Sequence, residues 1–192
     1  FRSTVGADFT NNLAVTLDVI DETGTDDTNT IVATDYTGNL TVTAGGTTRF
    51  TASDTSLVGG SGTDTLRLAG GNYGTTLEYV KNFENITITS DVSSAMTMAD
   101  ANVAATKTLT IDGSAIVSAA NSLTVNASNE ASGKYVIIGS TGSDTITGGS
   151  GVDTVTIAAA PTKALNGGSG TADVIVNNAT TDIVAGNANI AG

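Results

Sequence analysis

The chain of 192 residues contains no cysteine and no histidine. Without cysteine no disulfide can form, and without either residue the common protein ligands of zinc and copper are missing. Catalysis by cysteine–histidine or serine–histidine pairs is excluded for the same reason.

The chain is also poor in aromatic and basic residues. It has no tryptophan, four phenylalanines and four tyrosines, so its core must be aliphatic. Seven Lys and Arg residues stand against 19 Asp and Glu residues, which gives a net charge of −12. This charge repels nucleic acid and anionic membrane surfaces, and no run of about 18 apolar residues is present to span a membrane. We therefore expect no nucleic-acid partner and no membrane insertion.

What the chain does have is threonine in abundance, alternating with Val, Ile and Leu in short stretches. Long helix-forming charged residues are scarce, which favours strands over helices. The alternation and the Gly, Asn and Asp residues between the stretches predict an all-β fold with little or no helix. We expect strands within residues 13–20, 31–33, 36–43, 49–51, 79–89, 96–98, 109–111, 123–125 and 135–138.

Glycine and aspartate recur together in four units. Residues 139–156 read GSTGSDTIT and then GGSGVDTVT, so that Asp144 and Asp153 are nine residues apart. Residues 59–67 read GGSGTDTLR, and residues 167–175 read GGSGTADVI, where Ala172 is inserted before the aspartate. Glycine permits backbone conformations that let carbonyls converge, and calcium prefers carboxylate and carbonyl oxygens. The other interpretation is that Gly-Ser-Gly-Asp runs are ordinary turns.

These units resemble the calcium-binding nonapeptide repeat of the RTX proteins, which forms a parallel β-solenoid or β-roll. The resemblance implies that each calcium ion lies between two stacked turns and takes carbonyls and an aspartate from each, and we expect Asp144 and Asp153 to share one ion. The metal-binding residues that follow from it are Asp54, Gly59, Ser61, Thr63, Asp64, Gly139, Thr141, Ser143, Asp144, Gly148, Ser150, Val152, Asp153, Gly167, Ser169 and Asp173.

Two further stretches, YTGNLTVTA at 36–44 and NFENITIT at 82–89, resemble segments of bacterial S-layer proteins. The second is also similar to a rung that follows calcium-binding units in large RTX adhesins. The resemblance implies that Phe83 closes the end of a coil while Ile86 and Ile88 turn inward. It also implies secretion to the bacterial cell surface, self-association into a lattice or filament, and cell-surface polysaccharide as a further partner.

The chain divides into a strand-rich segment at 1–58, solenoid rungs at 59–138 and calcium-binding units at 139–192, which we expect to form one continuous β-domain. The sequence GGSGT occurs at 59 and again at 167, and we interpret the chain as an excerpt of a longer modular protein. The leading hypothesis is a structural surface-layer or filament protein. The alternatives are a repeat of an RTX adhesin and the calcium-binding tail of a secreted hydrolase. Neither HExxH nor GxSxG occurs, so we do not expect an enzyme.

Overall fold

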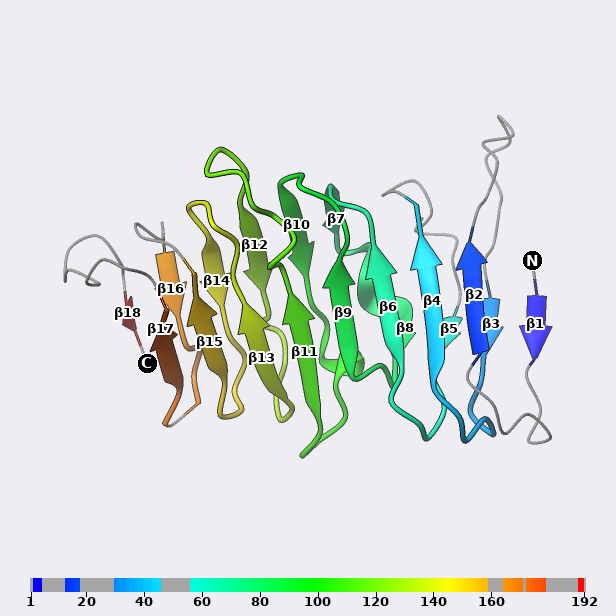
Figure 1. The fold of residues 1–192 in the computed structure, drawn as a ribbon. Coiled ribbons are helices and arrows are strands. Elements are labelled where there is room, and N and C mark those ends of the chain that lie inside the picture. Colours follow the sequence, from blue (N-terminus) through cyan, green and yellow to red (C-terminus); the bar gives the residue numbers. More distant parts are fainter. Residues whose placement is uncertain are drawn as a thin grey trace.

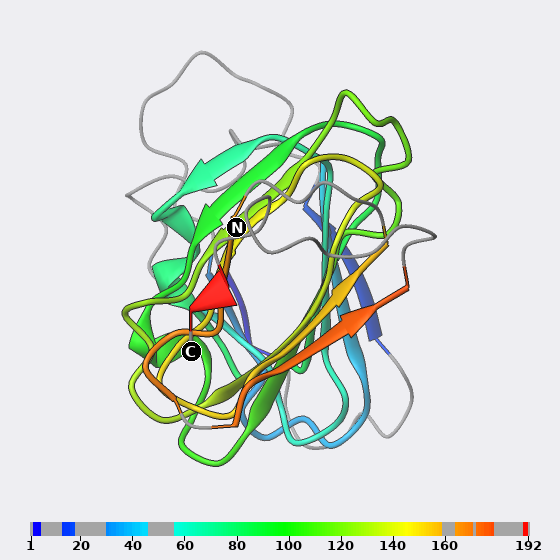
Figure 2. The ribbon, with the colours of Figure 1, turned by 90° about the vertical axis from the view of Figure 1, so that its left-hand side faces the viewer.

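The protein is a parallel β-solenoid. Its structure, a computed structural model, describes residues 2–4, 13–17, 30–45, 56–158, 164–170, 172–178 and 190–191. The described strands form three sheets, and all the pairings within them are parallel. Figure 1 shows the strands side by side from β1 at one end to β18 at the other, and the view along the stack in Figure 2 shows the coils wound between opposing walls.

One sheet of eight strands runs the length of the solenoid. Its strands lie in the order in which they occur in the sequence, and between any two of them the chain crosses to the other wall and returns. The sheet consists of β2 (Leu13–Leu17), β4 (Leu40–Ala44), β6 (Thr65–Leu68), β9 (Asn85–Ile88), β11 (Thr108–Asp112), β13 (Lys134–Ile138), β15 (Thr154–Ile157) and β17 (Val174–Asn177).

Two shorter sheets form the part of the solenoid that the eight-stranded sheet does not cover. The four-stranded sheet contains β1 (Arg2–Thr4), β3 (Thr30–Val32), β5 (Ser56–Val58) and β8 (Val80–Lys81). The six-stranded sheet contains β7 (Asn72–Gly74), β10 (Ser94–Thr97), β12 (Leu123–Asn126), β14 (Thr145–Thr147), β16 (Ala164–Asn166) and β18 (Ile190–Ala191).

Helix is confined to two short 3-10 segments in the described ranges, η2 (Thr76–Tyr79) and η3 (Asp100–Asn102). No helix among the described residues is both long enough and apolar enough to cross a membrane. The prediction of an all-β solenoid with almost no helix is therefore confirmed.

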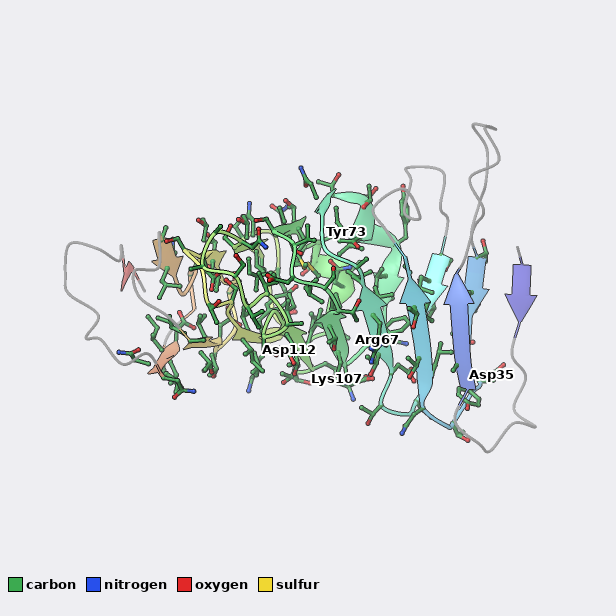
Figure 3. The ribbon with its side chains drawn as sticks, turned by 45° about the horizontal axis from the view of Figure 1, so that its top comes forward. Asp35, Arg67, Tyr73, Lys107 and Asp112 are labelled. Atoms are coloured by element: carbon green, nitrogen blue, oxygen red, sulfur yellow. The ribbon has the colours of Figure 1, made fainter. Side chains whose placement is uncertain are left out.

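Aliphatic side chains stack through the centre of the solenoid because alternate residues of each strand face inward. Register places one inward residue of each strand directly over the next, and all but the last member of the longest column are buried. The members of this column whose burial the structure describes are Val42, Leu66, Ile86, Ile111, Ile137, Val155 and Ile175. The intervening residues face outward, as Arg67 and Asp112 do (Figure 3).

The sequence-based expectations for the strands agree with the structure wherever it describes them. Phe83, Ile86 and Ile88 are buried, as the resemblance implied. The stretches at 18–20 and 49–51 lie outside the described residues. Parallel pairing of β4 with β6 and of β13 with β15 crosses the expected segment boundaries after 58 and after 138.

Candidate metal centre

The turns of the solenoid form two rows, and the glycine–aspartate units are divided between them. We call the turns that lead into strands of the eight-stranded sheet the first row, and those that lead into the six-stranded sheet the second row. The first row lies along the bottom of Figure 1. Turns 59–64, 148–153 and 167–173 precede β6, β15 and β17 and belong to the first row. Turn 139–144 precedes β14 and belongs to the second.

The predicted sharing of one ion by Asp144 and Asp153 is therefore wrong for topological reasons. A nine-residue unit supplies one turn and one strand, which is half a coil. A full coil at this point takes 18 residues, since Val136 is the register partner of Thr154. Two consecutive nine-residue units therefore lie in opposite rows. A unit stacks on the one that lies a full coil away in the same row.

The two glycine–aspartate turns that do stack directly are 148–153 and 167–173. The amide of Ser169 donates to the carbonyl of Gly149 at 2.9 Å, and the amide of Asp153 donates to Asp173 Oδ1 at 2.9 Å. The inserted Ala172 does not disturb this alignment, because it takes a positive φ of 73° and Thr154 still pairs with Val174. The unit with an inserted residue is therefore the stacking partner of an uninterrupted one.

The aspartates face the interior of the coil corner, where they accept main-chain hydrogen bonds. Asp64, Asp144 and Asp153 are 1% exposed or less. In each unit, Oδ1 accepts the amide of the residue at the same column position in the preceding coil, so the carboxylate ties two coils together. The pairs are Leu40 N with Asp64 at 2.8 Å, Leu123 N with Asp144 at 2.8 Å, Tyr135 N with Asp153 at 2.7 Å, and Asp153 N with Asp173 at 2.9 Å.

The second carboxylate oxygen closes the aspartate's own turn in three of the four units. It accepts the amide of the second residue of the unit, which is Gly60 at 2.5 Å, Ser140 at 2.8 Å or Gly149 at 2.7 Å. In the fourth unit, Asp173 Oδ2 is buried and has no hydrogen-bond partner. The carboxylates are thus turn-forming groups in their own right, and that of Asp173 has unused capacity.

The units need glycine where carboxylate or main-chain carbonyl oxygens approach the backbone too closely to leave room for a Cβ. At the first glycine of each unit, an added Cβ would clash with the carboxylate of the aspartate in the same unit. These glycines are Gly59, Gly139, Gly148 and Gly167. The fourth position lies against a carbonyl oxygen of the preceding turn in the row. These pairs are Gly62 with Gly38 O, Gly142 with Asn121 O, Gly151 with Gly133 O, and Gly170 with Gly151 O. The expected unusual backbone conformation is found, among the described unit glycines, only at Gly168, with φ of 104°.

Ser140, which replaces the second glycine in the 139–144 turn, has a structural role that the motif did not reveal. Its side chain is buried, its hydroxyl donates to Asp144 Oδ1, and that hydroxyl accepts the amide of Gly142 at 3.0 Å. The hydroxyl of Ser140 therefore gives the Asp144 carboxylate a hydrogen bond that a glycine at this position could not give.

The remaining predicted ligands occupy outward positions of the turns. The third residues of the units donate their amides to a carbonyl of the preceding turn, at 2.9 to 3.0 Å for Ser61, Thr141, Ser150 and Ser169. Thr63 N donates to Asn39 Oδ1 at 2.8 Å, and the side chains of Ser143 and Val152 are exposed. Asp54 lies outside the described residues.

Glu84 is a residue of this site that the sequence motif missed. The amide of Asp64 donates to Glu84 Oε2 at 2.7 Å, and register places Glu84 directly beside Asp64 because Thr65 pairs with Asn85. Glu84 thus joins its coil to the coil of Asp64, in the same way as Asp64 joins its own coil to that of Leu40. The turn that carries it has no glycine, so the only signal was an acidic residue immediately before a strand.

The electrostatics of the first row favour a cation. Burial raises the pKa of Asp153, as do the negative charges of Asp173 and Glu130, while the amides of Tyr135 and Gly149 oppose the shift. In the described part of the chain, no three acidic side chains converge closely enough to hold a metal by themselves. Calcium would therefore take one or two carboxylates here and complete its six to eight ligands with carbonyls and water. The orphaned Asp173 Oδ2 and the carbonyl-rich stack fit such an ion.

Acidification of the calcium-free protein is expected to stabilise it through Asp153. Because the pKa of Asp153 is raised on folding, the folded state binds a proton more tightly than the unfolded chain does. The free energy of unfolding should then rise as pH falls from neutral toward this pKa. Urea unfolding at a series of pH values should show a smaller rise for Asp153→Asn. Parallel pH profiles for the two proteins would contradict the assignment.

Comparison of the chain with models of protein families, with curated proteins and with solved structures gave no match.

Proposed function

We propose that this chain is a calcium-stabilised building block of a bacterial surface layer or filament, exported from the cell and assembled from copies of itself. The observation that carries the proposal is the stack of turns 148–153 and 167–173. Buried Asp153 and partly buried Asp173 lie there in neighbouring coils. The amide of Asp153 donates to Asp173 Oδ1, and burial together with the charge of Asp173 raises the pKa of Asp153. The role is structural rather than catalytic.

Calcium would act on the charge that the fold concentrates along the first row. Its binding would offset the repulsion between stacked carboxylates, and the site exists only when the coils are stacked. Asp153 and Asp173 would hold one ion and Asp64 with Glu84 another, each with carbonyls of the adjoining turns. Folding would therefore be coupled to the calcium concentration outside the cell, where modules of this kind bind with dissociation constants of about 10⁻⁴ to 10⁻³ M.

The end of the eight-stranded sheet supports self-association. Within the described ranges, β17 is its last strand, and the side chains of Val174 and Val176 are 46% and 38% exposed. A strand at the edge of a sheet offers unpaired amides and carbonyls to another chain. A second copy that pairs one of its strands with β17 would continue the sheet.

Electron microscopy of the purified protein tests this function. With millimolar calcium we expect ordered sheets or filaments, and with excess chelator we expect them to disperse. A protein that binds calcium but stays monomeric in sedimentation experiments would instead fit a rigid repeat of an adhesin. Assembly that is identical with calcium and with chelator would contradict the role of the ion.

A further inference from the structure

Among the described residues, Glu130 is the most deeply buried acidic side chain that the glycine–aspartate units do not include. It is 1% exposed and belongs to turn 127–133, which lies in the first row directly before turn 148–153. Its Oε1 accepts the amides of Ser132 and Gly133, both at 2.6 Å. Its Oε2 is buried and has no hydrogen-bond partner.

The turn of Glu130 is stacked on the turn of Asp153. The amide of Ser150 donates to the carbonyl of Glu130 at 3.0 Å, and a Cβ on Gly149 would lie 3.0 Å from the Cβ of Glu130. The negative charge of Glu130 contributes to the raised pKa of Asp153. Glu130, Asp153 and Asp173 therefore belong to three consecutive stacked turns of the first row.

A second buried oxygen without a partner belongs to Tyr135, the register neighbour of Asp153. The hydroxyl of Tyr135 is buried and has no hydrogen-bond partner, and the residue is 0% exposed. Burial raises the pKa of Tyr135, and the charges of Glu130, Asp153 and Asp100 raise it further. A buried carboxylate oxygen and a buried phenolic oxygen are each costly to leave without a partner, and a bound cation would satisfy an oxygen of either kind.

We infer that Glu130 holds a calcium-class cation of its own, between turn 127–133 and turn 148–153. The inference rests on the calcium role proposed above and extends it by one coil, into a turn that lacks the glycine pattern. The carboxylate of Glu130 is the anionic ligand, and main-chain carbonyls of the two turns and the Tyr135 hydroxyl are the neutral ones. A hard cation that accepts six to eight oxygens at flexible angles suits such a mixed set.

Terbium luminescence tests this site, because Tb³⁺ takes the ligands of calcium and is excited by a nearby tyrosine. The chain has no tryptophan to compete with tyrosine as the sensitiser. With tyrosine excitation we expect strong emission that calcium displaces. Tyr135→Phe should lose most of the emission, whereas Tyr73→Phe, whose hydroxyl donates to Ala69 O, should retain it.

Glu130→Gln should bind one calcium ion fewer than the natural chain in equilibrium dialysis and lose the Tyr135-dependent emission. Its amide oxygen keeps the acceptor for Ser132 and Gly133, and circular dichroism checks that the variant is folded. The same calcium count and the same emission in Glu130→Gln would overturn the inference. So would emission that depends equally on Tyr73 and Tyr135.

The failure of this inference can be separated from that of the proposed function. Asp64→Asn alters a distant turn of the same row and should lose a different ion, with the Tyr135-dependent emission intact. If Asp64→Asn loses an ion and Glu130→Gln does not, only the Glu130 site is refuted. If the natural chain binds neither Tb³⁺ nor calcium, both proposals are refuted.

Discussion

Gly151→Ala is expected to lower the free energy of unfolding by about 3 kcal/mol, the upper end of the usual cost of overpacking. An alanine Cβ at this position would fall on the carbonyl oxygen of Gly133 in the preceding turn. This oxygen belongs to the main chain of a stacked coil, so it cannot move aside as the end of a flexible side chain would. The two coils would have to separate, and the inward columns of aliphatic side chains would separate with them.

Gly45→Ala is the matched control for this substitution. The structure has no atom within 4 Å of an alanine Cβ at position 45. Reduced freedom of the unfolded chain should make this variant as stable as the natural protein or more stable by about 0.4 to 1 kcal/mol. Denaturant unfolding measures both variants under the same conditions. Equal effects at the two positions would show that close stacking of turns is not what requires Gly151.

Removal of calcium is expected to lower the melting temperature by roughly 6 to 11 °C. Each site at ten times its dissociation constant adds about 1.4 kcal/mol, so two sites add about 2.8 kcal/mol. For a chain of this length, 1 kcal/mol corresponds to about 2 to 4 °C. Scanning calorimetry with calcium and then with excess chelator measures the change.

Magnesium provides the control for this melting experiment. It demands a small octahedral set of ligands and gives up its waters reluctantly, so it should restore little of the lost stability. Equal recovery with magnesium would indicate general screening of the −12 net charge instead of a built site.

The sequence predicts the architecture well because both of its signals are local. Alternation of threonine with aliphatic residues marks each strand and shows which of its residues face inward, such as Val42 and Ile137. The glycine–aspartate units mark where the coils turn. Both are properties of a few consecutive residues, which is why the solenoid could be predicted without any knowledge of its pairing.

The pairing of the units could not be predicted, because it depends on the length of a coil. Asp144 and Asp153 are neighbours in the sequence but belong to opposite rows, whereas Asp153 and Asp173 are stacked. The column partners Leu40 and Asp64 are 24 residues apart, and Tyr135 and Asp153 are 18 apart. With coils of such different length, the register follows only from three-dimensional packing.

Glu84 and Glu130 escaped the sequence analysis for a related reason. Each lies in a turn without the glycine pattern, and each gains its importance from the turn stacked on it. Glu84 stands at the aspartate position of its turn, whereas Glu130 lies earlier in its turn, several residues before β13. Burial and register revealed both residues, and no short motif contains them.

Calorimetric titration of Asp153→Asn and Asp112→Asn with calcium tests most directly the central claim, which is that the aspartates of stacked turns hold the ion. Asp153 is 0% exposed in the first row of turns, whereas Asp112 lies at an outward position of β11 and accepts a local hydrogen bond from Ser114. Both substitutions remove one negative charge, so nonspecific attraction of calcium changes equally. The account predicts that Asp153→Asn binds fewer calcium ions than the natural chain and that Asp112→Asn binds the same number. Identical titrations of the two variants would contradict it.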